Sequence, residues 1–175
     1  MKGYTMYAKN TGMEIKVTSK VSEEKAAGKS ATGKEGRIAL RFFTFGNGDS
    51  HSLKFILNPL EAYGLYLSAA ELAKKGGKQT LIHKFAGEEG EVTSRLVVEK
   101  WEKEGKSGYA YTLKRGEGNA VNVPMDMVSF LYVGELMRAL SLEQAWSSYK
   151  ETESGDETAL AQTAASSGTA VPAKK

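Results

Sequence analysis

The sequence predicts an α+β protein in which antiparallel β-sheets carry helices on one side. The first observation is an internal duplication, with repeat one over about residues 12–76 and repeat two over about residues 78–145. In each repeat, consecutive strands lead into one helix, and such a duplication determines the whole fold. The second observation is an alternation of apolar and polar residues in the strand segments, which is typical of half-buried strands. Short strand connections favour antiparallel pairing, and helices grouped on one side are typical of the α+β class.

Repeat one is predicted to contain three strands followed by a helix. The strands are predicted at residues 13–17, 37–45 and 50–57. The segment 23–36 is rich in Lys, Ala, Gly, Ser and Thr, and it is predicted to be a mobile loop between strands. The helix is predicted to begin after Asn58, whose side chain can cap it, and to end at Gly76-Gly77.

Repeat two is predicted to contain four strands and a longer helix. The strands are predicted at residues 78–85, 93–103, 109–115 and 119–123. The helix is predicted to run from Pro124 at least to Leu140, with Asp126 two residues after the proline. Pro59 and Glu61 form the same pattern in repeat one, where proline suits the first helical position and the carboxylate suits the positive end of the dipole. The second helix is so apolar that a subunit interface is expected.

The net charge of +3 is unevenly distributed along the 175 residues. Residues 1–150, the predicted duplicated domain, contain 22 Lys and Arg against 17 Asp and Glu, whereas residues 151–175 contain 2 against 4. The modestly basic domain is compatible with a polyanionic partner without requiring one. Residues 151–175 are dominated by Ser, Thr, Ala and Gly, and they are predicted to be a disordered tail.

The absence of cysteine excludes disulfides and cysteine-ligated metal sites, and it suits an intracellular protein. The first residues lack the apolar run of a signal peptide, and no segment approaches the length of a membrane span. We therefore expect a cytoplasmic protein without a membrane partner, associated with the nucleoid if its source is prokaryotic.

The sequence contains no recognisable catalytic motif, and it predicts a protein that is not an enzyme and uses no cofactor or metal. His51 and His83 are far apart and do not have the spacing of metal ligands. The glycines of residues 46–49 are typical of a hairpin turn rather than of a phosphate-binding loop. An enzyme whose site is assembled from scattered polar residues is the least favoured alternative.

Basic and aromatic residues interleave on the predicted strands, and this pattern favours binding of single-stranded nucleic acid. Cations follow the phosphates while rings stack on bases, and each stacked base contributes about 1–3 kcal/mol. The pattern predicts a protein of low sequence specificity that binds single-stranded DNA or RNA. The candidate binding residues are Lys16, Arg37, Arg41, Phe43, Phe45, Lys54, Lys84, Arg95, Trp101, Lys103 and Lys114.

A second interpretation assigns the same residues to structure. Strands favour aromatic residues, so that Phe43, Phe45 and Trp101 would be core, and lysines commonly protect edge strands from aggregation. The chain would then be a protein-interaction or assembly module. Tyr109 and Tyr111 are predicted to line the core in either case, with their hydroxyls reaching its rim.

Three segments of repeat two resemble the single-stranded DNA-binding family related to positive cofactor four. They are residues 98–101 (Val-Glu-Lys-Trp), 104–106 (Glu-Gly-Lys) and 118–124 (Gly-Asn-Ala-Val-Asn-Val-Pro). The tandem duplication is similar to that of the Whirly proteins, which share this fold and assemble as tetramers, and the archaeal ThermoDBP-type proteins are a further similar group.

The resemblance implies single-stranded DNA binding on the sheets of a homo-oligomer, either a dimer or a tetramer, whose core is made by the helices. It also implies that Arg41, Phe43, Arg95 and Trp101 stand at matching places in the two repeats.

Overall fold

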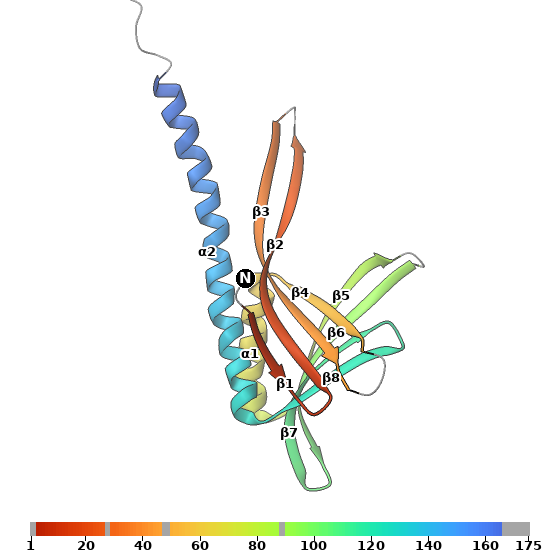
Figure 1. The fold of residues 1–175 in the computed structure, drawn as a ribbon. Helices are drawn as coiled ribbons and strands as arrows, with labels where there is room; N and C mark the ends of the chain where they lie inside the picture. The colour runs from red at the N-terminus through yellow and green to blue at the C-terminus, as the bar shows by residue number, and fades with distance from the viewer. Residues whose placement is uncertain (1–2, 27–28, 47–49, 88–89, 166–175) are drawn as a thin grey trace, which may run out of the picture.

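The computed structural model describes residues 3–26, 29–46, 50–87 and 90–165, which form two similar halves (Figure 1). Each half has four consecutive antiparallel strands and then a helix, and the strands of each sheet pair in chain order. The first half contains β1 (Gly3–Tyr7), β2 (Thr11–Ala26), β3 (Lys29–Thr44), β4 (Ser52–Leu57) and α1 (Pro59–Lys75). The second contains β5 (Gly77–Gly87), β6 (Gly90–Lys103), β7 (Lys106–Arg115), β8 (Asn119–Met125) and α2 (Met127–Ala165). We call β1–β4 sheet A and β5–β8 sheet B.

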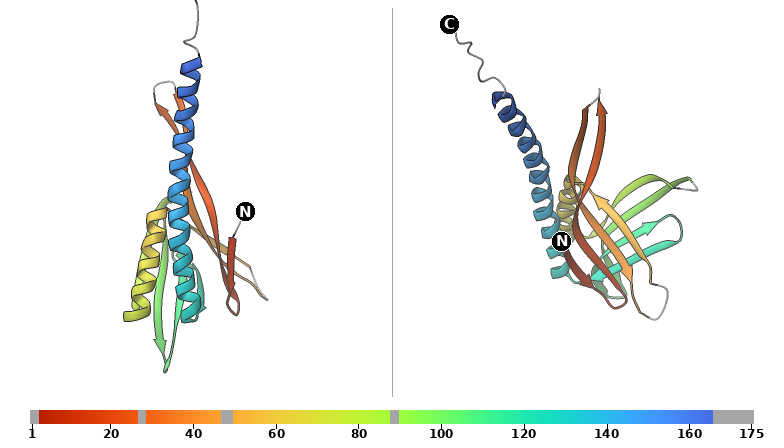
Figure 2. Two further views of the ribbon diagram at one scale, coloured as in Figure 1. Left: turned by 90° about the vertical axis from the view of Figure 1, so that its left-hand side faces the viewer. Right: turned by 45° about the horizontal axis from the view of Figure 1, so that its top comes forward.

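The two helices lie side by side, and both sheets spread away from them on one side (Figures 1 and 2). The predicted α+β class, the antiparallel pairing and the placement of the helices are therefore confirmed. No helix in the described ranges is long and apolar enough to cross a membrane.

Repeat one contains a strand that the sequence interpretation missed. β1 pairs with β2 from Gly3 opposite Lys16 to Tyr7 opposite Gly12, so repeat one begins earlier than residue 12. The predicted loop at 23–36 was also wrong, because its described residues continue β2 and β3 as a long hairpin. Backbone hydrogen bonds between neighbouring strands hold such a hairpin, and these bonds require no apolar alternation in the sequence. The tip at residues 27–28 lies outside the described residues, as do most of the turns predicted at 46–49 and between β5 and β6.

The two helices begin differently. At α1 the predicted cap is confirmed, since Asn58 Oδ1 accepts from the Glu61 amide at 2.8 Å and Glu61 Oε2 accepts from the Asn58 amide at 2.9 Å. At α2 the predicted start was wrong, because Pro124 lies in the edge strand β8, where a missing amide hydrogen is tolerated. Asp126 caps α2 instead, accepting from the Ser129 amide at 2.7 Å.

α2 continues to Ala165, so part of the segment predicted as a disordered tail is helical. The tail prediction was made from composition, since Ser, Thr, Ala and Gly dominate from residue 151 onward. Of these residues, 151–165 belong to α2, and residues 166–175 lie outside the described part of the chain.

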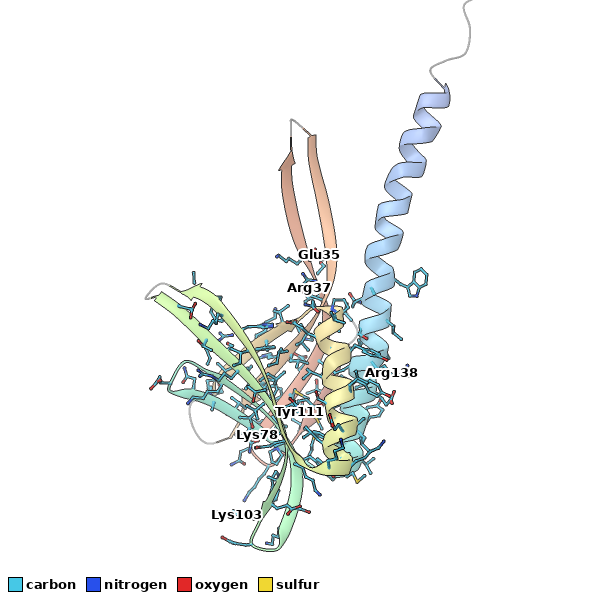
Figure 3. All side chains as sticks on the ribbon, turned by 180° about the vertical axis from the view of Figure 1, so that it is seen from behind. Glu35, Arg37, Lys78, Lys103, Tyr111 and Arg138 are labelled. Carbon is cyan, nitrogen blue, oxygen red and sulfur yellow. The ribbon has the colours of Figure 1, made fainter. Side chains whose placement is uncertain are left out.

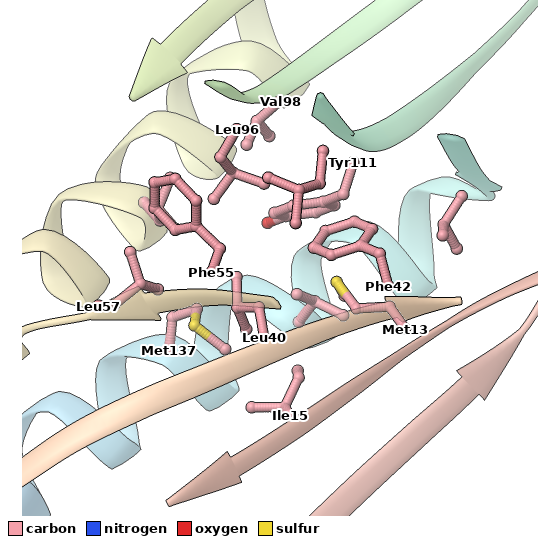
Figure 4. Close-up of a cluster of buried hydrophobic side chains, with 14 of the residues drawn as sticks. Met13, Ile15, Leu40, Phe42, Phe55, Leu57, Leu96, Val98, Tyr111 and Met137 are labelled. Atoms are coloured by element: carbon pink, nitrogen blue, oxygen red, sulfur yellow. The ribbon is translucent and has the colours of Figure 1, made fainter. Parts of the chain in front are cut away.

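One hydrophobic core lies between the inner faces of the two sheets and the helices (Figure 4). Phe42 from sheet A, Tyr111 from sheet B and Phe130 from α2 are fully buried in it. The predicted core position of Tyr109 and Tyr111 is confirmed, and the Tyr109 ring stacks on Phe130 with centroids 4.5 Å apart. The Tyr111 hydroxyl does not reach the rim, however. It is buried without a hydrogen-bond partner, and this burial raises the pKa of the Tyr111 phenol above its usual value.

Polar contacts between described residues join the sheets directly. Thr11 Oγ1, at the start of β2, donates to the Asn122 carbonyl of β8 at 2.8 Å. Arg115 Nη2, at the end of β7, donates to the Lys54 carbonyl of β4 at 2.7 Å. The same guanidinium donates from Nε to Ser94 Oγ at 3.3 Å and lies 5.4 Å from the centroid of the Phe85 ring. The relative position of the sheets is therefore fixed by hydrogen bonds as well as by the core.

Candidate nucleic-acid interface

Strand alternation places the predicted binding residues that lie within strands on the outward face of their sheet, and Phe45 follows the end of β3 beside them. Leu40 and Phe42 are buried in the core, so Arg41 and Phe43 of the same strand point outward. The same argument applies in sheet B, where Leu96 and Val98 are buried and the odd-numbered residues of β6 point outward. The outward set in sheet A is Lys16, Arg37, Arg41, Phe43, Phe45 and Lys54, and in sheet B it is Lys84, Arg95, Trp101, Lys103 and Lys114.

Three rings form an aromatic cluster at one end of sheet A. The cluster consists of Tyr7, Phe43 and Phe45, with ring centroids 5.8–6.1 Å apart. Tyr7 is 69% exposed and Phe45 is 39% exposed, whereas Phe43 is partly buried. The Arg41 guanidinium lies 5.7 Å from the Phe43 centroid, within cation–π range. Of the rings that the sequence interpretation predicted, Phe45 is exposed and Phe43 is partly buried beside the cation Arg41.

The Phe43 ring lies on a glycine of the neighbouring strand. Gly12 is the cross-strand partner of Phe43, and a Cβ added at Gly12 would be 2.4 Å from Phe43 Cζ. Non-bonded atoms do not approach one another this closely. The Phe43 ring can therefore occupy this position only because residue 12 is glycine. Because Gly12 has no side chain, Phe43, the innermost ring of the aromatic cluster, packs directly against the sheet.

A carboxylate lies among the cations of sheet A. Glu14 Oε1 is 2.7 Å from Lys16 Nζ, and Glu14 Oε2 is 3.9 Å from Arg41 Nη1. The Glu14 side chain is only 17% exposed, so these attractions are less screened than those on the open surface. Lys54 lies directly across from Arg41 on β4. The positive charge of this face is therefore partly neutralised by Glu14, a residue that the sequence interpretation did not single out.

The predicted cations on sheet B lie in three places, and the first is a pair. Arg95 and Lys114 are cross-strand partners in the middle of the sheet, and both point outward. Lys103 lies at the tip of the β6–β7 hairpin (Figure 3), 3.9 Å from a Glu104 carboxylate oxygen. Lys84 Nζ is 2.8 Å from Glu91 Oε1. Only the first group brings two predicted cations together.

Trp101 lies on a glycine in the same way as Phe43. Its cross-strand partner is Gly108, and a Cβ added there would be 2.6 Å from Trp101 Cζ2. The indole is partly buried, and it is held against the backbone of β7. Trp101 is thus neither a core residue nor a freely rotating surface side chain.

Solved structures with the same architecture include plant proteins. WHY3 from Arabidopsis thaliana matches with a TM-score of 0.59 at 18% identity, covering 90% of this chain and 97% of that one. WHY1 from Arabidopsis thaliana matches with a TM-score of 0.58 at 16% identity, covering 80% and 88%. The chain has the Whirly fold. The plant transcriptional regulator PBF-2 is a further match, with a TM-score of 0.56 at 17% identity, covering 95% and 90%. No protein-family model and no curated protein sequence matches the chain.

The Whirly fold corrects one part of the repeat alignment. Arg41 and Phe43 lie on β3, the third strand of sheet A, whereas Arg95 and Trp101 lie on β6, the second strand of sheet B. These residues do not stand at matching places, contrary to the expectation. The alignment was shifted by one strand because β1 was missed, and the true counterpart of β6 is β2.

The two outward faces of this Whirly fold point away from one another, because both inward faces contribute to one core. The predicted residues therefore form two surfaces and not a single patch.

Among the described residues, no group of three or more His, Cys, Asp and Glu side chains is placed to hold a metal ion. His83 lies between sheet B and α1, where its Nε2 is 2.8 Å from Glu61 Oε1 and its ring stacks on Phe55.

Arg37 is the predicted cation that is most occupied by its own neighbours. Its guanidinium donates to the carboxylate of Glu35 and to the carbonyl of Gly36, and its side chain is only 20% exposed.

Tyr7 was missed by the sequence interpretation, although it belongs to the aromatic cluster. The available signal was the short segment GYTMY, in which Tyr4 and Met6 alternate with the polar Thr5.

Proposed function

We propose that this protein binds single-stranded nucleic acid, most readily DNA, with low sequence specificity and without catalysing a reaction. The observation that carries this proposal is the aromatic cluster of sheet A, with Arg41 over Phe43 and Lys54 opposite Arg41. Exposed rings accept bases of any sequence because every base has a π-face, while the cations attract phosphates. The Whirly fold supports the proposal, because the resemblance of the sequence to this group implies single-stranded DNA as the ligand.

Phosphates would be held by Arg41 and Lys54 on sheet A and by Arg95 and Lys114 on sheet B. Bases would stack on the aromatic cluster and on Trp101. Lys16 and Arg37 would contribute less, because each is within contact distance of a carboxylate. The same applies to Lys84, whose partner is Glu91 at 2.8 Å. Lys103 would contribute less because it lies at the tip of the β6–β7 hairpin, apart from the other predicted cations.

Self-association through the helices is part of the proposal. Large apolar side chains are exposed on both helices, and such residues commonly mark interaction surfaces. They include Leu60 and Leu67 on α1 and Val128, Tyr132 and Leu142 on α2. Light scattering from the purified chain tests this part, and a monomer at micromolar concentration would refute it.

The test of the main proposal is fluorescence anisotropy of a labelled oligo-dT at low and at moderate salt. Binding that weakens as salt rises, and that unlabelled duplex does not displace, would support single-strand binding. No binding at low salt would refute it.

A protein-interaction or assembly module is the second candidate, favoured by the same exposed apolar helix residues. It predicts that no nucleic acid co-purifies with the chain. Nucleic acid that co-purifies and is lost in high salt would count against it. A cytoplasmic location is proposed for either function, with nucleoid association if the source is prokaryotic.

A further inference from the structure

A cleft of about 720 Å³ lies where the β1–β2 turn of sheet A meets sheet B and the start of α2. Sites for small ligands commonly enclose about 300–1,000 Å³, so a nucleotide is a suitable size for it. The side chains that matter here come from both halves of the chain. They are Lys9, Lys100, Trp101, Tyr109, Met125 and Met127.

The aromatic side of the cleft is held in place by the fold. Trp101 lies on Gly108, which leaves no space for the ring to sink toward β7. The Tyr109 ring stacks on Phe130 of α2 with an interplanar angle of 24°. Rings that are fixed before a ligand arrives do not lose conformational freedom when it binds. Tyr109 belongs to the core, so it is the partly exposed Trp101 ring that offers the cleft a prepared flat surface, with apolar methionine side chains beside it.

The charged side of the cleft is suited to a phosphate. Lys9 is exposed in the β1–β2 turn, whereas Lys100 is already engaged by a carboxylate, with its Nζ 3.4 Å from Glu102 Oε1. Asp126 also lines the cleft, but its carboxylate accepts from the Ser129 amide, and this hydrogen bond lowers the pKa of Asp126. The negative charge of Asp126 is therefore opposed by the positive end of the α2 dipole. A cation, a fixed ring and an apolar wall together match a nucleotide.

The cleft adjoins the aromatic cluster of sheet A along the chain. Tyr7 belongs to that cluster, and the next residues, Ala8 and Lys9, line the cleft. Thr11 Oγ1, which donates to the Asn122 carbonyl, holds the turn against β8. A chain of nucleotides can therefore leave the outward face of sheet A and reach sheet B by passing round one turn.

We propose that a bound single strand continues from the aromatic cluster round the β1–β2 turn and places one nucleotide in this cleft. The base lies against Trp101, and Lys9 receives a phosphate beside it. This inference rests on the proposed function, and it adds a path between the two surfaces within one protomer. It assigns Lys9 and Tyr7 to the ligand path, and neither of them was predicted from the sequence.

The experiment uses the full chain with Trp146→Phe, which leaves Trp101 as its only tryptophan. Oligo-dT of increasing length is titrated while anisotropy of a label and emission of Trp101 are followed. We expect the longer oligonucleotides to quench Trp101. Lys9→Ala should reduce the magnitude of the salt slope by about 0.7, the contribution of one single-strand phosphate contact. Lys9→Arg is the matched control, and it should retain the slope because it keeps the charge.

A ring replacement provides a second measurement that does not depend on quenching. Trp101→Ala should weaken binding about 5- to 150-fold, as expected for one lost stacked base, whereas Trp101→Phe should restore much of the affinity. If Trp101→Ala unfolds the protein, the Trp101→Phe and Lys9 variants still report on the cleft.

The outcomes separate this inference from the proposed function. Binding by anisotropy with unchanged Trp101 emission, and with Lys9→Ala equal to the parent, would overturn the cleft and leave single-strand binding intact. In that case Phe43→Ala should still weaken binding. No anisotropy change at low salt would overturn the proposed function and the path together.

Discussion

The indole of Trp101 lies directly on Gly108, its partner on the neighbouring strand, with no space for a Cβ between them. The Phe43 ring lies on Gly12 in the same way. In both pairs, a large aromatic side chain on the outward face of a sheet covers the backbone of a glycine, which has no side chain of its own. Each ring thus gains a supporting surface without being buried in the core.

Gly108→Ala should displace the Trp101 ring. The added methyl would be 2.6 Å from Cζ2, so ring or strand must move, and overpacking of this kind costs about 1–3 kcal/mol. Thermal or chemical denaturation measures this loss, and oligo-dT affinity should fall with it. The matched control is Gly118→Ala, where an added Cβ meets nothing within 4 Å. Equal stability of the two variants would contradict the arrangement.

Removing the Glu14 carboxylate should strengthen nucleic-acid binding. Glu14→Gln frees Lys16 and Arg41 from their common partner, so both cations become available to phosphates. We expect an affinity gain of roughly two- to fivefold, as suits a weak ion pair near the surface. A salt series by anisotropy measures the gain, which should shrink as salt rises. Glu117→Gln in the exposed β7–β8 turn serves as control, and a gain of the same size there would argue for a general charge effect.

The double variant Arg41→Ala/Arg95→Ala tests both outward faces together. If each guanidinium contacts one phosphate, the magnitude of the salt slope should fall by about 1.4, which is twice the single-strand value of about 0.7 per contact. Arg138→Gln is the control, because Arg138 lies on α2 and pairs with Glu135 at 2.8 Å (Figure 3). An unchanged slope in the double variant would exclude both residues from the phosphate path.

Tyr111→Phe should stabilise the protein. The variant removes a buried hydroxyl that has no partner, and such a group costs about 1–3 kcal/mol. The free energy of unfolding, measured with urea at neutral pH, should rise by about 1 kcal/mol or more. A clear loss of stability would show that the hydroxyl has a partner in solution.

The same phenol should make stability depend on alkaline pH. Burial raises the pKa of Tyr111 in the folded state, while an unfolded tyrosine ionises near pH 10. The contribution of the protonated Tyr111 phenol to the free energy of unfolding is therefore complete below about pH 10. It is lost as the pH rises above that value, because only the unfolded state releases the proton. Urea denaturation from pH 8 to 11 should show a shallower decline for Tyr111→Phe than for the parent. Parallel curves would contradict the raised pKa.

The alternation of apolar and polar residues allowed much of the fold to be predicted, because a strand with one buried face has apolar residues at every second position. Leu40 and Phe42, and likewise Leu96 and Val98, identify the inward faces, and from these the outward position of every candidate residue follows. The α1 cap at Asn58 was also predictable, since capping is a local interaction.

Features set by pairing between distant segments could not be predicted in this way. The long β2–β3 hairpin depends on backbone hydrogen bonds that do not require apolar side chains. Pro124 is tolerated only because β8 is an edge strand, and strand order is not visible in the local sequence. Tyr7 and Glu14 join the candidate site through β1 and β2, so their roles appear only once those strands are paired.

The hydrogen bond from Arg115 to the Lys54 carbonyl has a consequence for any ligand that spans both sheets. Two surfaces joined by a flexible linker would have to be brought into position each time a ligand binds. Here the entropy of their relative motion has already been lost on folding. A nucleotide chain held on one surface therefore encounters the second at a high and nearly constant effective concentration. Weak contacts on each sheet can in this way sum to tight binding by one small domain.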